Sequence, residues 1–139
     1  MKQIEITQPI YTFQIDSAHH VSNIVYIQWM EIARLKLLEE AGLPVHLIEK
    51  RGFAPVLTRT EINYRKPLFL GDTVRVVLWI SELKRISARL QFQFFNQEGE
   101  LVADGSQVAV FIRLPEQRPY RLPNEERILF EPFLETESS

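Results

Sequence analysis

The fold is decided by the stretch from Ser22 to Pro44, which reads SNIVYIQWMEIARLKLLEEAGLP. Ser22 and Asn23 are good N-cap residues, and Gly42 followed by Pro44 is typical of a helix end, so the stretch predicts one long helix over about 24–41. At 100° per residue one apolar stripe emerges, formed by Tyr26, Met30, Ala33, Leu37 and Ala41 with Ile27 and Leu38 on its flank. We expect this stripe to face the core.

A second apolar group lies on nearly the opposite side of the same helix. It consists of Ile24, Val25, Ile32 and Leu35. A helix that lies on a single sheet needs only one apolar face, so the second group indicates another surface, most simply a partner subunit, with a covering loop as the alternative. We therefore expect a homodimer or, as a dimer of dimers, a homotetramer.

Strand patterns surround the helix. One precedes it, and four follow, over about 56–64, 73–80, 86–94 and 108–114, with apolar and polar side chains alternating. Gln97, Glu98 and Gly99 form a hairpin turn, and Pro67 to Gly71 breaks the chain between two of the strands. The order predicts an α+β fold in which an antiparallel sheet of about five or six strands wraps around one long helix.

Length and composition limit the function. A chain of 139 residues with 45% apolar and 24% charged side chains is one globular domain, so we expect a single domain over 1–139, with residues 118–139 as a C-terminal arm whose acidic end is disordered. The net charge of −2 argues against nucleic acid, and the lack of cysteine excludes disulfides and thiol nucleophiles. No signal peptide or membrane span is visible, which predicts a cytoplasmic protein.

Chemistry-bearing residues gather between the first strand and the helix, in the segment DSAHHVSN over 16–23. A partly desolvated carboxylate at Asp16 could act as nucleophile or as general base toward water. The first N–H groups of the following helix lack intrahelical acceptors and could stabilise an oxyanion. Because an aspartate before a helix is also a common structural cap, the segment by itself leaves both interpretations open.

The stretch FQIDSAHHVSNIVYIQWMEIARLKLLEEAG, residues 13–42, resembles the signature of hotdog-fold thioesterases of the 4-hydroxybenzoyl-CoA thioesterase type. The residues that match in order are Asp16, His20, Val21, Asn23, Tyr26, Glu31 and Arg34. Downstream, residues 62–72, INYRKPLFLGD, resemble the family's Y-x-x-P-x-x-x-G-D turn. The likeness extends over about residues 10–115.

The resemblance implies hydrolysis of an acyl thioester of coenzyme A or of acyl carrier protein at a dimer interface, without metal or organic cofactor. Asp16 stands at the catalytic aspartate, which attacks the carbonyl or activates water, and a backbone amide at about Asn23 is the oxyanion donor. His20 would orient the Asp16 loop or line the pocket. Two departures affect turn geometry: His19 stands where the family has glycine, and Gln14 replaces a frequent acidic residue.

Other assignments compete with this one. Glu31 is the alternative catalytic carboxylate, but the role that we expect for it is a structural ion pair with Arg34, three positions along the helix. A metal site at Asp16, His19 and His20 lacks further ligands at helical spacing, so we expect none.

Two basic groups stand in the middle of the chain. Lys84 and Arg85, followed by Arg89, are either a solvated strand end or the seat of coenzyme A phosphates, which the resemblance implies for the first two. Arg59, Arg65 and Lys66 form the second group.

The alternative functions are a non-catalytic acyl-thioester binding protein and a dehydratase that uses Asp16 and His20 on a hydroxyacyl thioester. The sequence leaves open the acyl group, which could be aromatic, naphthoyl or fatty, as well as the carrier.

Overall fold

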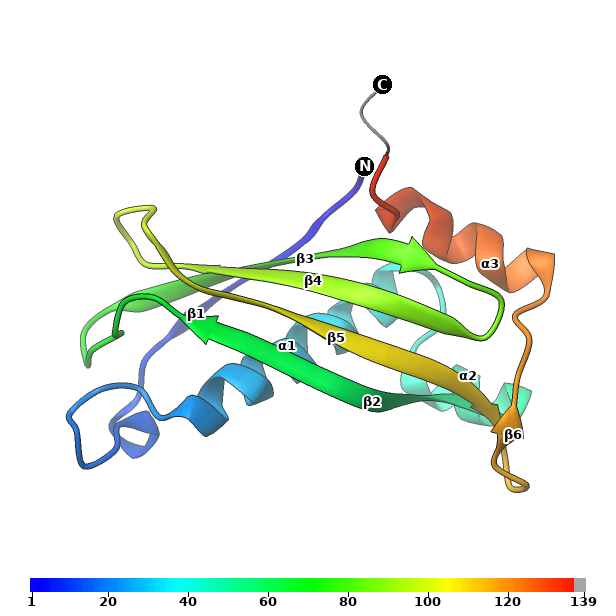
Figure 1. The fold of residues 1–139 in the computed structure, drawn as a ribbon, viewed down its shortest axis with the longest axis horizontal. Coiled ribbons are helices and arrows are strands. Elements are labelled where there is room, and N and C mark those ends of the chain that lie inside the picture. The colour runs from blue at the N-terminus through cyan, green and yellow to red at the C-terminus, as the bar shows by residue number, and fades with distance from the viewer. Residues whose placement is uncertain (137–139) are drawn as a thin grey trace.

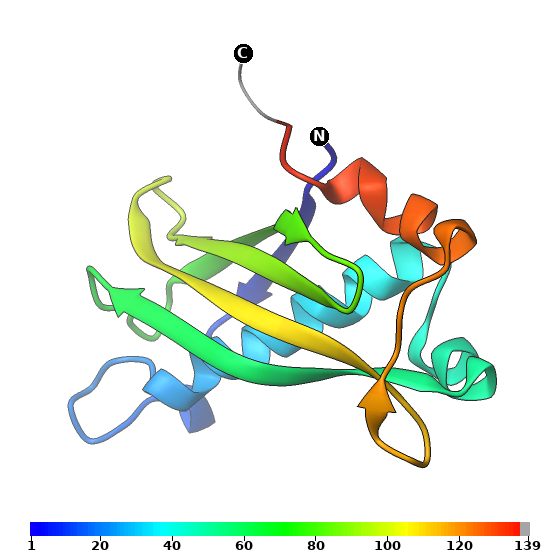
Figure 2. The same cartoon turned by 45° about the vertical axis from the view of Figure 1, so that its right-hand side comes forward.

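The computed structural model describes residues 1–136 as a curled antiparallel sheet with one long helix against it (Figure 1). The strands are β1 (Ile4–Pro9), β2 (Phe53–Tyr64), β3 (Thr73–Leu83), β4 (Ser87–Phe95), β5 (Leu101–Arg113) and β6 (Arg118–Pro119). Their order is β1-β3-β4-β5-β2, with the short β6 beside β5. The helices are α1 (Asn23–Glu40), α2 (Val45–Arg51) and α3 (Asn124–Phe130). This is the predicted α+β hotdog arrangement, and a turned view shows α1 crossing under the strands (Figure 2).

The helix α1 matches its prediction closely. The Ser22 hydroxyl caps it by accepting the Ile24 N–H at 3.4 Å, and Gly42, at φ +83°, follows its end. All five residues of the predicted stripe are buried. The second apolar group divides: Val25 is buried, whereas Ile24, Ile32 and Leu35 are 67%, 41% and 41% exposed. Val25 is therefore covered within the chain, as the alternative allowed, and the other three residues form the part of the group that a partner could cover.

The predicted first strand does not extend as far as Asp16. The strand β1 ends at Pro9, and a 3-10 turn over Thr12–Gln14 follows. A single bridge between Ile15 and Val21 then closes the loop that holds Asp16. Proline has no N–H to continue a ladder, which fits the early end of the strand.

The C-terminal arm forms β6, α3 and a 3-10 turn over Glu131–Phe133, packed at the α2 end of the sheet. The Glu126 side chain is buried and accepts hydrogen bonds from Arg51 at 3.0 Å and from the Tyr120 hydroxyl at 2.5 Å. Burial and the bond to Glu126 raise the pKa of Tyr120 to about 12. The expected disorder of the acidic end falls on residues 137–139, which lie outside the described residues.

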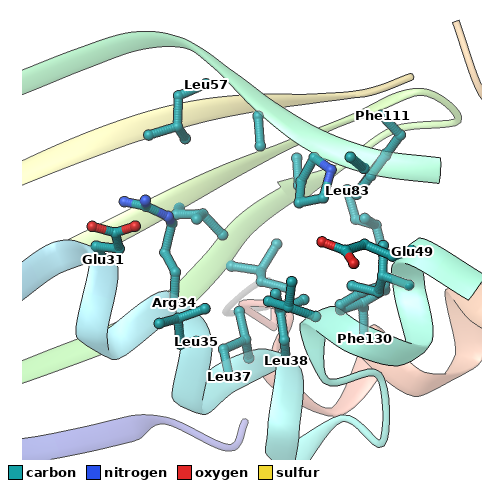
Figure 3. Close-up of a pocket in the computed structure, with 18 of the residues that line it drawn as sticks. Glu31, Arg34, Leu35, Leu37, Leu38, Glu49, Leu57, Leu83, Phe111 and Phe130 are labelled. Carbon is teal, nitrogen blue, oxygen red and sulfur yellow. The ribbon is translucent and has the colours of Figure 1, made fainter. Parts of the chain in front are cut away.

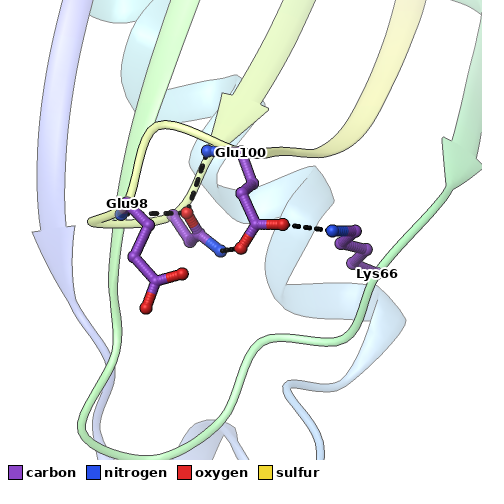
Figure 4. A network of polar contacts seen from close by, with 4 residues as sticks. Lys66, Glu98 and Glu100 are labelled. Carbon is purple, nitrogen blue, oxygen red and sulfur yellow. Dashed lines mark hydrogen bonds and ion pairs between the residues drawn. The ribbon is translucent and has the colours of Figure 1, made fainter.

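The turn between β4 and β5 is held by a polar network (Figure 4). The Asn96 side-chain oxygen accepts the N–H groups of Glu98 and Glu100 at 3.0 Å each, and its amide nitrogen donates to the Glu100 carboxylate at 3.2 Å. Lys66 forms an ion pair with the same carboxylate. The hydrogen bonds from Lys66 and Asn96 lower the pKa of Glu100 to about 2.

At Gly105 the sheet leaves no room for a side chain. A Cβ atom there would lie 2.3 Å from the Glu61 carbonyl oxygen and 3.0 Å from the Met30 methyl group. We expect Gly105→Ala to destabilise the fold by about 1–3 kcal/mol, because backbone on β2 must move. Denaturant unfolding measures this, with Ser106→Ala as a control that adds no atom. Equal stability of the two variants would contradict the close approach.

The Glu100 network predicts a pH dependence. Because the pKa of Glu100 is lower in the folded chain than its ordinary value, the network stabilises the fold above about pH 4.5, and this contribution is lost as pH falls toward 2. In Lys66→Ala we expect the pKa of Glu100 to rise, whereas Lys66→Arg keeps it low. A carboxyl-carbon NMR titration measures both, and an unchanged midpoint in Lys66→Ala would refute the assignment.

Candidate active site

The loop before α1 forms the start of the candidate site. Its backbone closes on itself, since the Asp16 N–H donates to the His20 carbonyl at 2.9 Å and the His19 N–H donates to the Asp16 carbonyl at 3.0 Å. His19 adopts φ +66°, a left-handed conformation. The family's glycine would adopt this conformation without strain, and the turn therefore does accept a side chain here.

The Asp16 carboxylate lies on the outside of this loop. Its side chain is exposed, and Oδ1 accepts the Ala18 N–H at 2.9 Å. The expected partial desolvation is thus not present within one chain, because the loop projects beyond the end of the sheet (Figure 1). The carboxylate is held in an Asx turn and has no salt-bridge partner among residues 1–136.

The other end of the loop borders a small pocket at the start of α1. Asn23 is the first helical residue, and its N–H has no acceptor in the described part of the chain. The pocket has a volume of about 230 Å³ and is lined by His20, Val21, Asn23, Tyr26, Tyr64, Arg65, Lys66 and Pro67. His20 also meets the edge of the Phe69 ring, with 5.3 Å between ring centroids. Predicted residues His20 and Asn23 therefore lie together at one pocket, whose lining does not include Asp16.

Two tyrosines of this pocket were missed as site residues. Tyr64 donates its hydroxyl to the Asn23 carbonyl at 3.4 Å and meets the ring of Tyr26 edge-on, with 5.1 Å between centroids. Burial raises the pKa of both phenols, that of Tyr26 to about 12. The signal was available, because each tyrosine belongs to one of the two matched motifs.

The structure does not bring Lys84 and Arg85 to this pocket within one chain. They form the turn between the end of β3 and the start of β4. The start of α1 lies at the other end of the sheet, where β3 begins at Thr73 beside the end of β1. The two ends are opposite in Figure 1. Lys84 pairs loosely with Glu82 at 3.2 Å, and no ion pair of Arg85 occurs in residues 1–136.

The second basic group is neutralised within the chain. Each of its three cations forms an ion pair with a carboxylate. The pairs are Arg59 with Glu61, Arg65 with Asp104 and Lys66 with Glu100. Arg65 and Lys66 line the pocket at the start of α1, but their charges are already balanced.

The expected ion pair between Glu31 and Arg34 is absent from the described ion pairs. Arg34 instead donates to the side-chain oxygen of Gln107 at 2.7 Å, and Gln107 donates to the Thr60 hydroxyl at 3.2 Å. Gln107 is fully buried on β5, and burial lowers the pKa of Arg34. Sequence reasoning missed Gln107, whose one signal is a polar residue within an apolar strand.

A larger cavity lies toward the other end of α1, with a volume of about 280 Å³ (Figure 3). It lies between α1, α2, the end of α3 and the sheet, it is open to solvent on one side, and most of its lining is aliphatic or aromatic. In Figure 3, Glu31 and Arg34 lie at one side of the cavity, and Glu49 and Phe130 lie at the other.

Within residues 1–136 no three histidine or acidic side chains gather as a metal site would require. Among the helices of the described chain, none has the length and apolar character needed to cross a bilayer.

Comparison with known proteins places this geometry in a family. Residues 12–130 match the model of the thioesterase-like superfamily. The long-chain acyl-CoA thioesterase FadM of Escherichia coli (strain K12) is 30% identical over 116 residues, which are 83% of this chain and 87% of that protein. The putative acyl-CoA thioesterase YneP of Bacillus subtilis (strain 168) is 30% identical over 100 residues, 72% of this chain and 70% of that one.

A solved structure agrees on the fold. The DHNA-CoA thioesterase of Staphylococcus aureus superposes with a TM-score of 0.88 at 24% identity, covering 95% of this chain and 91% of that one. These matches favour a hydrolase over the binding protein and the dehydratase that the sequence left open. The chain belongs to the thioesterase-like superfamily and is a thioesterase of the 4-hydroxybenzoyl-CoA thioesterase type with a hotdog fold.

Proposed function

We propose that this thioesterase hydrolyses acyl-coenzyme A or acyl-carrier-protein thioesters with the Asp16 carboxylate and the Asn23 amide. The observation that carries the proposal is the Asp16 loop, which joins the carboxylate to a pocket whose edge is the open N-terminus of α1. The N–H groups of that terminus carry partial positive charge, which favours a developing oxyanion.

The chemistry follows from these two groups. The thioester carbonyl oxygen accepts a hydrogen bond from the Asn23 N–H. Asp16 either attacks the carbonyl carbon or removes a proton from the attacking water. When Asp16 acts as the base, collapse of the tetrahedral intermediate breaks the carbon–sulfur bond and gives the free acid and a thiolate, which takes the proton that Asp16 removed from water. When Asp16 attacks, the collapse releases the thiolate and leaves an acyl anhydride on Asp16, which water then hydrolyses to the free acid. His20 borders the pocket and fixes the loop through its carbonyl, so we assign it a positioning role.

A second copy of the chain would complete the site. The strand β2 pairs only with β5 among the described strands, so its twelve residues leave one edge open, with Val56 41% and Leu57 36% exposed. An open edge of this length favours pairing with another strand. Two-fold pairing of β2 with its own copy is antiparallel, and it sets the Phe53 end of one copy against the Tyr64 end of the other.

This pairing has two consequences for the site. It covers the pocket beside Tyr64 and so desolvates the region of Asp16. It also carries the turn of Lys84 and Arg85 from one copy toward the α1 start of the other. We therefore propose that these two cations bind coenzyme A phosphates across a homodimer, which itself could pair into a homotetramer.

For the catalytic carboxylate we expect Asp16→Asn to lower kcat for thiol release by about 10²–10⁴-fold, the contribution of a positioned base or nucleophile. The asparagine oxygen can still accept the Ala18 N–H, so folding is preserved. A thiol-reactive chromophore measures the release without background, because the chain has no cysteine. Ser17→Ala in the same loop is the matched control. Wild-type turnover in Asp16→Asn would exclude Asp16 as the catalytic carboxylate.

For the phosphate seat we expect the double variant Lys84→Ala, Arg85→Ala to raise KM for acyl-coenzyme A about tenfold, with little change in kcat, since charge-assisted contacts to phosphate are lost. The double variant Lys36→Ala, Lys50→Ala is the matched control, because it removes the same amount of positive charge away from the turn between β3 and β4. Mixed dimers, in which one subunit carries Lys84→Ala and Arg85→Ala and the other carries Asp16→Asn, then show whether the two cations serve the Asp16 of their own subunit or that of the partner. If the two cations act across the interface, the mixed dimers recover a wild-type KM, and if KM stays high, they act within one chain. An unchanged KM in the double variant itself would exclude the seat.

A further inference from the structure

We infer that exposed cations at the β3–β4 turn and beside β6 form a docking surface for an acyl carrier protein that presents an acidic face. This basic surface consists of Lys84, Arg85, Arg113, Arg118 and Arg121, all of which are exposed. The inference rests on the proposed function, whose β2 dimer turns this end of one copy toward the Asp16 loop of the other, and it names the carrier of the acyl group.

The backbone brings these cations to one end of the sheet. The Leu122 N–H donates to the Arg85 carbonyl at 2.9 Å, which places Arg121 beside the β3–β4 turn. The strand β6 pairs with the end of β5, and Arg118 stands opposite Arg113 in that pair. In Figure 1 the β3–β4 turn and β6 lie at the same end of the molecule. Three segments of the chain thus share one basic surface.

The positive charge of the basic surface is not balanced by the chain itself. No ion pair among residues 1–136 contains any of its four arginines, and its lysine pairs only with Glu82, at 3.2 Å. The whole chain has a net charge of −2, so this excess of positive charge is a local property. A partner with acidic side chains would supply the missing counter-charges.

Two arginines of the basic surface face each other. Arg113 and Arg118 are direct partners in the β5–β6 pair, and like charges in that position destabilise paired strands. Glu116, in the turn that joins them, forms an ion pair with neither in the described chain. The Tyr120 ring holds the Arg113 guanidinium, 5.2 Å from the ring centroid. An external carboxylate would relieve the repulsion between the two guanidinium groups.

The width and composition of the basic surface favour a protein over a phosphate group alone. Phe111 of β5 donates its N–H to Ile86 on one side and accepts the Tyr120 N–H on the other. Two strand spacings, about 10 Å, therefore separate the two edges of the surface. Ile86 and Leu114, next to arginines in the chain, are 38% and 36% exposed. Arginines accompanied by apolar side chains are typical of protein interfaces.

The basic surface extends the proposed phosphate seat. Coenzyme A and acyl carrier protein present the acyl group on the same phosphopantetheine arm, so Lys84 and Arg85 can bind its phosphate in either carrier. Arg113, Arg118 and Arg121 add charge that an acidic protein face would use. Complementary charge of this kind speeds association, so its loss should appear in kcat/KM.

The test compares two thioesters of one acyl group, hexadecanoyl-acyl carrier protein and hexadecanoyl-coenzyme A. In Arg118→Glu with Arg121→Glu we expect kcat/KM for the carrier-protein thioester, divided by that for the coenzyme A thioester, to fall at least about tenfold, because the reversed charges repel an acidic carrier. Lys2→Glu with Lys36→Glu makes the same change in net charge beside β1. This matched control should keep the ratio within about twofold of wild type, since it leaves the basic surface intact.

Two further variants separate charge from folding. Arg118→Lys with Arg121→Lys retains the charge and should restore most of the ratio. If melting shows that the charge-reversal variant does not fold, Arg118→Gln with Arg121→Gln decides, and the ratio should then fall about threefold.

The outcomes distinguish the inference from the proposed function. An unchanged ratio, an equal loss for both thioesters, or a loss confined to the coenzyme A thioester overturns the inference. A wild-type chain that hydrolyses only the coenzyme A thioester overturns it as well. A wild-type chain that hydrolyses neither thioester would instead refute the proposed function.

Discussion

The close approach of α1 to β5 at Gly105 is the contact on which the remaining structure depends. Met30 lies over the glycine with no exposed surface, and a Cβ on Gly105 would meet both Met30 and the carbonyl of Glu61. The middle of α1 is thereby seated deep in the curl of the sheet. Buried apolar side chains along this contact each contribute about 1.5–3 kcal/mol. Both ends of the helix are left with open space, the start with free N–H groups and the far half with a cavity.

Much of this fold is readable from the sequence because it follows from periodicity and from a few breaking residues. The stripe of α1, its cap at Ser22 and its end at Gly42 are local features, and the structure confirms them. The burial of Val25 also fits the periodicity, because at 100° per residue Val25 lies 40° from buried Trp29, whereas Ile24, Ile32 and Leu35 lie beyond the buried arc.

In the candidate site, too, the local features could be predicted from the sequence and the long-range ones could not. His20 and Asn23 are close in sequence, and they line one pocket. The place of Lys84 and Arg85 depends on strand direction, since a turn between β3 and β4 lies at the far end of an antiparallel pair. Asp16 is exposed in the single chain because of how its loop closes, and the partner of Arg34 is Gln107, 73 positions away in the chain. Such long-range contacts leave no trace in residue spacing.

The two basic groups differ in how far their charges are already balanced within the chain, which bears on the proposed phosphate seat. Arg65 and Lys66 line the pocket, yet each already holds a carboxylate, Asp104 and Glu100. A phosphate that displaced either acid would exchange one ion pair for another and leave a carboxylate beside it, with small net gain. Arg85 has no ion pair among residues 1–136, and the contact of Lys84 with Glu82 is loose and exposed. The more distant cations therefore have more to gain from a phosphate, and the proposed antiparallel dimer through β2 would bring them to it.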